Sequence, residues 1–166
     1  WKRLVADGHR PAAVGGDSAG GCLALLLAMH LRDGGLPGPG ALVLISPLGD
    51  LADDIADRFR TSPGELLIPA AWAERVRRAY LTGTDPASPE VSPLRGDLSG
   101  LPPTILQASE AEVLASDARR IAEAMDTATL DLWPALQHVW HLHAGRAPAA
   151  DAAIAQLGDF LRERTS

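Results

Sequence analysis

The stretch Pro11–Arg32, which reads PAAVGGDSAGGCLALLLAMHLR, decides the fold of this chain. A short apolar run over Pro11–Val14 leads into glycines, and this run predicts a strand. Residues 19–32 leave little polar face, which is typical of a buried helix. The segment between them, Gly16-Asp-Ser-Ala-Gly20, fits the pattern G-x-S-x-G. The stretch therefore predicts a strand, a sharp turn that carries a serine, and a buried helix.

This turn would give Ser18 the surroundings that a nucleophile needs. A serine on so sharp a turn takes a strained backbone conformation. We expect that the turn requires glycine at positions 16 and 20, because larger side chains there would collide across it. The hydroxyl would stand at the carboxyl end of the sheet, where the helix N-terminus stabilises a developing oxyanion. The backbone N–H of Ala19 would donate one hydrogen bond to that oxyanion.

A glycine-rich turn before a helix can instead bind phosphate. The sequence has neither a following Gly-Lys-Ser/Thr nor the spacing G-x-G-x-x-G, both of which accompany phosphate loops. The strand–turn–helix setting therefore favours the nucleophile over the phosphate loop.

Apolar runs alternate with helical patterns along the rest of the chain. This alternation predicts an α/β fold, a mostly parallel sheet with helices on both faces, in a single domain over residues 1–166. Residues 50–69 mix charge, Gly and Pro and are predicted to be a loop or lid, with 50–80 as a lid or cap-like insertion. The further strands are expected at 41–45, 104–108 and 127–133, and the further helices at 1–8, 70–80, 113–125 and 149–164.

Composition excludes several other classes. The formal net charge is −6 with no long basic run, so no nucleic-acid partner is expected. The longest apolar stretch, 20–31, is too short for a membrane span and is interrupted by His30. One cysteine, Cys22, excludes an intrachain disulfide, and with no visible signal peptide we expect a cytoplasmic location. Because Trp1 opens the chain in helical sequence, the natural N-terminus is expected elsewhere.

A nucleophilic serine needs a base, and the chain has five histidines. His9 and His30 are expected to be solvated or structural. His138, His141 and His143 follow the last predicted strand, from which a loop can reach the carboxyl edge of the sheet. A metal site would be an alternative for paired histidines, but no acidic or cysteine partner stands at ligand spacing, so no metal is expected.

The acid that orients the base is expected after the strand at 104–108. Three carboxylates follow this strand: Glu110, Glu112 and, slightly later, Asp117. Each could instead be a helix N-terminal charge, which the helix dipole favours. The chain order of serine, acid and histidine is nevertheless the order of α/β-hydrolase triads.

Several separated blocks resemble the hormone-sensitive-lipase-like branch of bacterial α/β-hydrolase esterases. The resemblance implies Ser18 as nucleophile, His138 as general base, and Glu112 as orienting acid at the place where many relatives have Asp-Pro-Leu. It also implies hydrolysis of short- to medium-chain carboxylic esters without a cofactor, and often a homodimer. The blocks are Gly16-Asp-Ser-Ala-Gly-Gly21, Ser46-Pro-Leu48, Ser92-Pro-Leu94, Leu101-Pro-Pro103, Glu112-Val-Leu114 with Asp117, and His138-Val-Trp140.

The chain departs from the family pattern in three places. It has no His-Gly-Gly-Gly loop, which supplies further oxyanion donors in the family, and lacks the early strands and the N-terminal cap. The strand before the serine turn Gly16–Gly20, which we call the elbow, is predicted at Pro11–Val14 and is short, and Glu112 precedes His138 by only 26 positions. Because one lost oxyanion donor costs about 3–4 kcal/mol of transition-state stabilisation, the alternative expectation is a truncated hydrolase-fold protein without catalytic competence.

Overall fold

A computed structural model describes residues 1–9 and 11–165 and contains a four-stranded sheet in the order β1-β2-β3-β4. All three neighbouring strand pairs are parallel, as the sequence predicts. Parallel strands need crossover connections, and a helix or a longer helical segment supplies each of them. The strands are β1 (Ala13–Asp17), β2 (Ala41–Ile45), β3 (Thr104–Ser109) and β4 (Ala128–Trp133).

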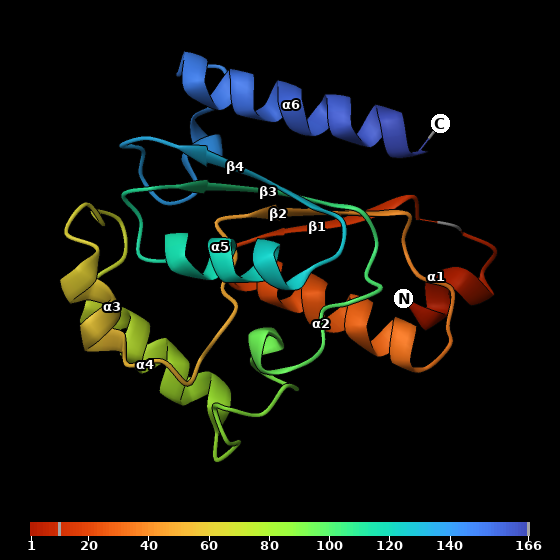
Figure 1. The fold of residues 1–166 in the computed structure, drawn as a ribbon, viewed down its shortest axis with the longest axis horizontal. Helices are drawn as coiled ribbons and strands as arrows, with labels where there is room; N and C mark the ends of the chain where they lie inside the picture. The colour runs from red at the N-terminus through yellow and green to blue at the C-terminus, as the bar shows by residue number, and fades with distance from the viewer. Residues whose placement is uncertain (10, 166) are drawn as a thin grey trace.

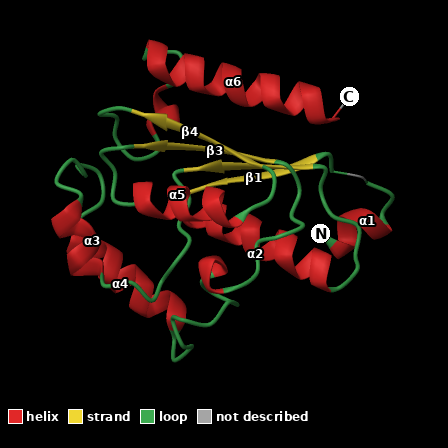
Figure 2. Ribbon diagram, in the orientation of Figure 1, coloured by secondary structure: helices red, strands yellow, loops and turns green. Residues whose placement is uncertain are grey.

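The helices cover both faces of the sheet. Helix α6 lies along one face, while α2 and α5 cover the other (Figures 1 and 2). The arrowheads of the strands point towards the side of the molecule on which α3 and α4 lie (Figure 1). The helices are α1 (Lys2–Ala6), α2 (Ala19–Asp33), α3 (Ile55–Thr61), α4 (Ala70–Leu81), α5 (Ala115–Ala124) and α6 (Pro148–Thr165), with short 3-10 helices η1 (Pro93–Arg95) and η2 (Trp140–His143).

The strand before the elbow is longer than predicted. β1 runs through the glycines to Asp17 and has five residues, so the expectation of a shortened strand at Pro11–Val14 is wrong. Gly15 pairs with Val43 and Gly16 pairs with Leu44. The ladder with the apolar β2 therefore keeps the glycines extended, whatever their own weak strand preference.

Part of the predicted loop at 50–69 is helical. Asp54 caps α3 by accepting a hydrogen bond from the backbone N–H of Asp57 at 2.8 Å. Such an N-cap aspartate was the available sequence signal. The low apolar content of this seven-residue helix concealed it. Within the described residues, no helix combines the length and apolar character needed to cross a membrane.

The main core lies between the sheet and the α2–α5 layer. Leu42, Leu44 and Leu106 are fully buried on this face of the sheet, because alternate strand residues share a face. From the helices, Leu25 and Ile121 pack into the same cluster with no exposed surface. This packing holds α2 against the sheet, directly after the turn that carries Ser18.

Candidate active site

Ser18 sits on the turn between β1 and α2 in a strained conformation. Its backbone angles are φ 53° and ψ −120°, a region that non-glycine residues rarely adopt. The Ser18 N–H donates to the Ile45 carbonyl at 2.8 Å, and its own carbonyl accepts from the Leu48 N–H at 3.0 Å. Hydrogen bonds to the end of β2 thus hold the strained residue on both sides.

The steric need for glycine falls on Gly16 and Gly21. A Cβ on Gly16 would stand 2.2 Å from the carbonyl oxygen of Gly20, and one on Gly21 would stand 2.8 Å from Cβ of Pro47. A Cβ on Gly20 would meet nothing within 4 Å, so the expectation that its side chain would collide is wrong. Gly16 lies against the backbone of Gly20, so Gly16 must lack a side chain, whereas Gly20 has room for one.

Ala19 is the first residue of α2 and lines the pocket that adjoins Ser18. The first backbone N–H groups of a helix have no acceptor within the helix. The N–H of Ala19 is one of these groups, and its role as an oxyanion donor stays a prediction.

The structure brings His138 and Glu112 together in the interior. Nδ1 of His138 lies 2.8 Å from Oε2 of Glu112, and both side chains are buried. The other carboxylate oxygen of Glu112, Oε1, accepts from the backbone N–H of Ser109 at 3.1 Å. The carboxylate is therefore held by a strand end while it contacts the imidazole.

The other two candidate carboxylates lie elsewhere. Glu110 is exposed and pairs with Arg119 at 3.5 Å. Asp117 is buried and accepts from the backbone N–H of Gly49 at 2.7 Å. Burial raises the pKa of Asp117, although the adjacent Arg58 guanidinium opposes that rise. Of the three predicted acids, Glu112 is therefore the one that contacts a histidine, His138, among the described residues.

The loop that carries His138 is tied to the same strand end as the elbow. The backbone N–H of Val139 donates to Oγ of Ser46 at 3.2 Å, and Ser46 directly follows Ile45. Both Ser46 (φ 47°) and Val139 (φ 51°) have left-handed backbones. Among the described residues no hydrogen bond joins the Ser18 hydroxyl to the His138 ring. Catalytic hydrogen bonds of this kind often tighten only when substrate is bound.

His141 and His143 have other partners. Nε2 of His141 lies 2.8 Å from Oε1 of Gln107, and burial lowers the pKa of His141 to about 4 against the opposing charges of Asp17 and Asp131. Nε2 of His143 lies 2.7 Å from Nε2 of Gln137 in an exposed pair. Within the described ranges, no group of three His, Cys, Asp or Glu side chains could hold a metal ion.

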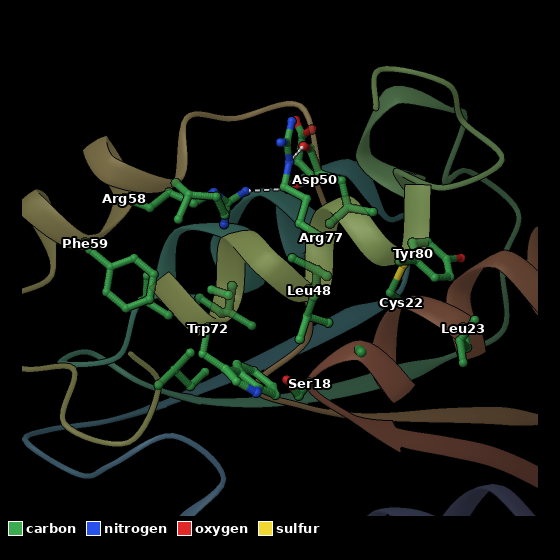
Figure 3. A pocket seen from close by; sticks show the side chains of 18 residues that line it. Ser18, Cys22, Leu23, Leu48, Asp50, Arg58, Phe59, Trp72, Arg77 and Tyr80 are labelled. Atoms are coloured by element: carbon green, nitrogen blue, oxygen red, sulfur yellow. Dashed lines mark hydrogen bonds between the residues drawn. The ribbon is translucent and has the colours of Figure 1, made fainter. Parts of the chain in front are cut away.

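A pocket with a volume of about 290 Å³ opens beside Ser18 (Figure 3). Cys22 and Leu23 of α2 line one wall, and burial raises the pKa of the Cys22 thiol to about 12, so this neighbour of Ser18 is a poor nucleophile. Trp72 and Tyr80 of α4 also line the pocket and are about half exposed. The remaining lining side chains are mostly apolar, among them Leu48, Leu51, Ile55, Phe59, Ile68, Val76, Val113 and Leu114.

An ion-pair network holds the pocket wall against α5. Arg58 of α3 lies 2.9 Å from Asp117 of α5, and both side chains are buried. Arg120 joins the same network through Asp50 at 2.9 Å and Asp53 at 2.9 Å. Sequence reasoning missed this network because its members are separated by up to 70 positions along the chain.

The sheet, the elbow and the buried His–carboxylate pair together have the architecture of an α/β hydrolase. The comparisons with known proteins agree with this class. The family model described as "alpha/beta hydrolase fold" matches residues 2–142. An acetyl-hydrolase of Streptomyces hygroscopicus is 41% identical over 99% of this chain, and the esterase LipU of Mycobacterium tuberculosis is 34% identical over 99% of it.

Solved structures show the same likeness. A crystal structure of EstE5 superposes with a TM-score of 0.90 at 33% identity over 98% of this chain. An esterase from the bacterial hormone-sensitive lipase family superposes with a TM-score of 0.87 at 34% identity over 99% of it. The chain belongs to the α/β-hydrolase fold family, in its hormone-sensitive-lipase-like branch.

The chain spans little more than half the length of these relatives. It covers 57% of the acetyl-hydrolase and 59% of LipU. It covers 57% of the EstE5 chain and 58% of the second esterase structure.

Proposed function

We propose that this chain carries the catalytic triad of a serine ester hydrolase, with Ser18 as nucleophile, His138 as general base and Glu112 as orienting acid. The observation that carries the proposal is the buried contact of 2.8 Å between His138 and Glu112. It lies in a loop anchored to the same strand end as the strained Ser18 elbow. A His–carboxylate pair oriented in this way is what activates a serine hydroxyl.

The ester would be hydrolysed in two acyl-transfer steps, through an acyl-enzyme intermediate on Ser18. Nε2 of His138 takes the proton of Ser18 as Oγ attacks the ester carbonyl, and the N–H of Ala19 donates to the oxyanion. The protonated imidazole, held at Nδ1 by Glu112, then gives its proton to the leaving alcohol. Water then takes the place of the alcohol. His138 accepts a proton from the water as it attacks the acyl-enzyme and returns a proton to Oγ of Ser18 as the carboxylic acid leaves, so the cycle needs no cofactor.

The pocket supports a small apolar ester as the substrate. Its walls are mostly aliphatic and aromatic, and a volume of about 290 Å³ lies near the lower limit for small-molecule sites. We infer a short- to medium-chain acyl or alcohol group, and a lid formed by residues 50–80, whose α3 and α4 side chains line the pocket. A homodimer and a cytoplasmic location remain predictions from the sequence.

A second candidate is a hydrolase-fold module that binds ligands without turnover. Ala19 is the single oxyanion donor that we assign among the described residues. An oxyanion donor is worth about 3–4 kcal/mol in the transition state. Turnover therefore distinguishes the two candidates more sharply than binding does.

A fluorophosphonate probe and p-nitrophenyl esters test the proposal in the protein. We expect the probe to label Ser18, and labelling that persists in Ser18→Ala would contradict the assignment. Hydrolysis of p-nitrophenyl acetate or butyrate should fall by roughly 10⁴-fold or more in His138→Ala. His143→Ala, which changes an exposed histidine of the same loop, is the matched control and should keep the activity. Labelling of Ser18 without any turnover would favour the second candidate.

A further inference from the structure

The hydroxyl of Ser109 joins the two loops that carry Glu112 and His138. Ser109 is the last residue of β3 and is fully buried. Its Oγ donates to the carbonyl of Leu136 at 2.6 Å and accepts from the N–H of the same residue at 3.0 Å. It also accepts from the N–H of Ala111 at 3.2 Å. One donor and two acceptor sites are all that a hydroxyl offers, so its capacity is fully used.

These contacts begin where the backbone ladder ends. Ser109 pairs with Trp133 in the register of β3 and β4, and the next backbone hydrogen bond runs from the Glu110 N–H to the Trp133 carbonyl at 2.9 Å. Beyond that bond the chain after β3 turns towards α5, while the chain after β4 enters the loop of His138. Leu136 lies in this second loop, so the Ser109 hydroxyl continues the connection that the ladder no longer provides.

The Ser109 hydroxyl contacts the chain just before each member of the His–Glu pair. Leu136 stands two residues before His138, and Ala111 stands one residue before Glu112. The backbone N–H of Ser109 adds a direct bond to Oε1 of Glu112 at 3.1 Å. Ser109 therefore touches the acid itself and the backbone that leads to the base.

We propose that Ser109 is the positioning residue of the triad: it sets the separation and orientation of Glu112 and His138 through its hydroxyl. The inference rests on the proposed function, because it takes Glu112 and His138 as acid and base. Loss of the hydroxyl leaves the N–H and C=O of Leu136 and the N–H of Ala111 without this partner. The two loops then lose a shared anchor, while the nucleophile, the base and the acid are all still present.

Ser92 provides a matched control. It is also a fully buried serine, whose Oγ donates to the Pro86 carbonyl at 2.7 Å and accepts from the Leu51 N–H at 2.8 Å. Replacement of either serine by alanine therefore breaks the same kinds of bond in the interior. Only Ser109 stands between the loops of the acid and the base, so a general packing effect would appear in both variants.

Nitrogen–proton correlation spectra of the histidine rings, recorded where the rings are neutral, test the proposal without any turnover. The His138 signals are those that disappear in His138→Ala. In the unmodified protein we expect the proton of His138 on Nδ1, because the partner of one ring nitrogen decides the tautomer. In Ser109→Ala the signals should move towards a mixture of the two tautomers. Ser109→Thr, which keeps the hydroxyl, should restore them, and Ser92→Ala should leave them unchanged.

Kinetics provide the second readout. Because a displacement of about 1 Å can cost on the order of 100-fold in rate, we expect kcat for p-nitrophenyl butyrate to fall by about 10- to 100-fold in Ser109→Ala, with KM unchanged. Absence of Ser18 labelling in the unmodified protein would refute the proposed function, while the ring spectra would still decide the role of Ser109. His138 signals in Ser109→Ala that match those of the unmodified protein would overturn the positioning role.

Discussion

Both faces of the sheet bury apolar side chains, and the face beneath α6 also carries a polar cluster around Gln107. Beneath α2 and α5 the sheet presents leucines, and Leu44 and Leu106 are fully buried there. Beneath α6 it presents Gln107, whose Nε2 donates to Asp131 at 3.1 Å and to Gln156 of α6 at 3.0 Å, while its Oε1 meets His141 at 2.8 Å. The same strand, β3, supplies Leu106 to one face and Gln107 to the other.

This difference separates stability from positioning. Apolar burial is favourable but not directional, so the α2–α5 face can stabilise the fold without fixing any loop in detail. Hydrogen bonds are directional, and a buried polar group left without a partner is costly. On the α6 face such bonds reach His141 of η2, three residues after His138, and the Ser109 hydroxyl reaches Leu136, two residues before it. These polar contacts on the α6 face therefore hold the segments on either side of the candidate base in place.

The largest effect is expected on the apolar face. Leu106→Ala should lower the free energy of unfolding by about 3–5 kcal/mol, because it leaves a cavity in a packed core. Urea denaturation followed by circular dichroism measures this change. Leu142→Ala, at a side chain that is 76% exposed, is the control and should change stability by less than about 0.5 kcal/mol. A loss below about 1 kcal/mol for Leu106→Ala would show that the α2–α5 face is not the main source of stability.

A smaller loss is expected when the polar cluster around Gln107 is made apolar. Gln107→Leu keeps a side chain of similar size but removes the partner of His141, Asp131 and Gln156. We expect a loss of about 1–3 kcal/mol in the free energy of unfolding, since the buried His141 ring then lacks its partner at Nε2. Asp131 keeps the N–H of Trp133, and Gln156 is exposed. The exposed pair of Gln137 and His143 gives the control Gln137→Leu, measured by the same denaturation. Equal stability of Gln107→Leu and the unmodified protein would remove the distinction between the two faces.

The burial of His141 on the α6 face makes the stability of the fold depend on pH. Burial holds the pKa of His141 near 4, against an ordinary value of 6.5. As pH falls through 6.5 the unfolded chain binds a proton that the folded ring refuses until about pH 4, so stability decreases over this window. The expected loss between pH 7 and pH 5 is about 2 kcal/mol.

His141→Gln removes the titrating ring and is the variant for this test. We expect its free energy of unfolding to decrease by about 2 kcal/mol less than that of the unmodified protein over the same pH interval. Chemical denaturation at the two pH values measures the difference. Parallel pH profiles for the two proteins would show that His141 titrates alike in the folded and the unfolded chain.

The smallest effect is expected for Gly20→Ala at the start of α2, and Gly21→Ala is its matched partner. Gly20→Ala should raise the free energy of unfolding by up to about 1 kcal/mol, because its Cβ meets nothing within 4 Å and alanine favours the helix. Gly21→Ala should instead lower it by about 1–3 kcal/mol, since its Cβ would stand 2.8 Å from Cβ of Pro47. Thermal denaturation of this pair tests how closely α2 approaches the end of β2. A higher free energy of unfolding in both variants would contradict the close contact between Gly21 and Pro47.

Strands with continuous apolar runs were predictable from the sequence, and shorter mixed segments were not. β2 was predicted at its observed bounds, and β4 began one residue later than expected, because alternating or continuous apolar residues mark buried strands. α3 was missed because seven mixed residues hold too few apolar positions to show a helical period. The end of β1 was predicted too early, at Val14, because its glycines carry no side-chain signal. Pairing with β2 decides the conformation of these glycines.

The sequence by itself determined the alternation of strands and helices and the serine elbow, because periods of 2 and 3.6 residues are local properties of the chain. It left three carboxylates and three histidines as candidates, and only the resemblance selected Glu112 and His138. The tertiary structure decided that these two meet at 2.8 Å, that Gly21 rather than Gly20 needs to be small, and that Ser109 joins their loops. Such contacts join residues that can be far apart in the chain, and their distances depend on how the whole sheet and its loops close.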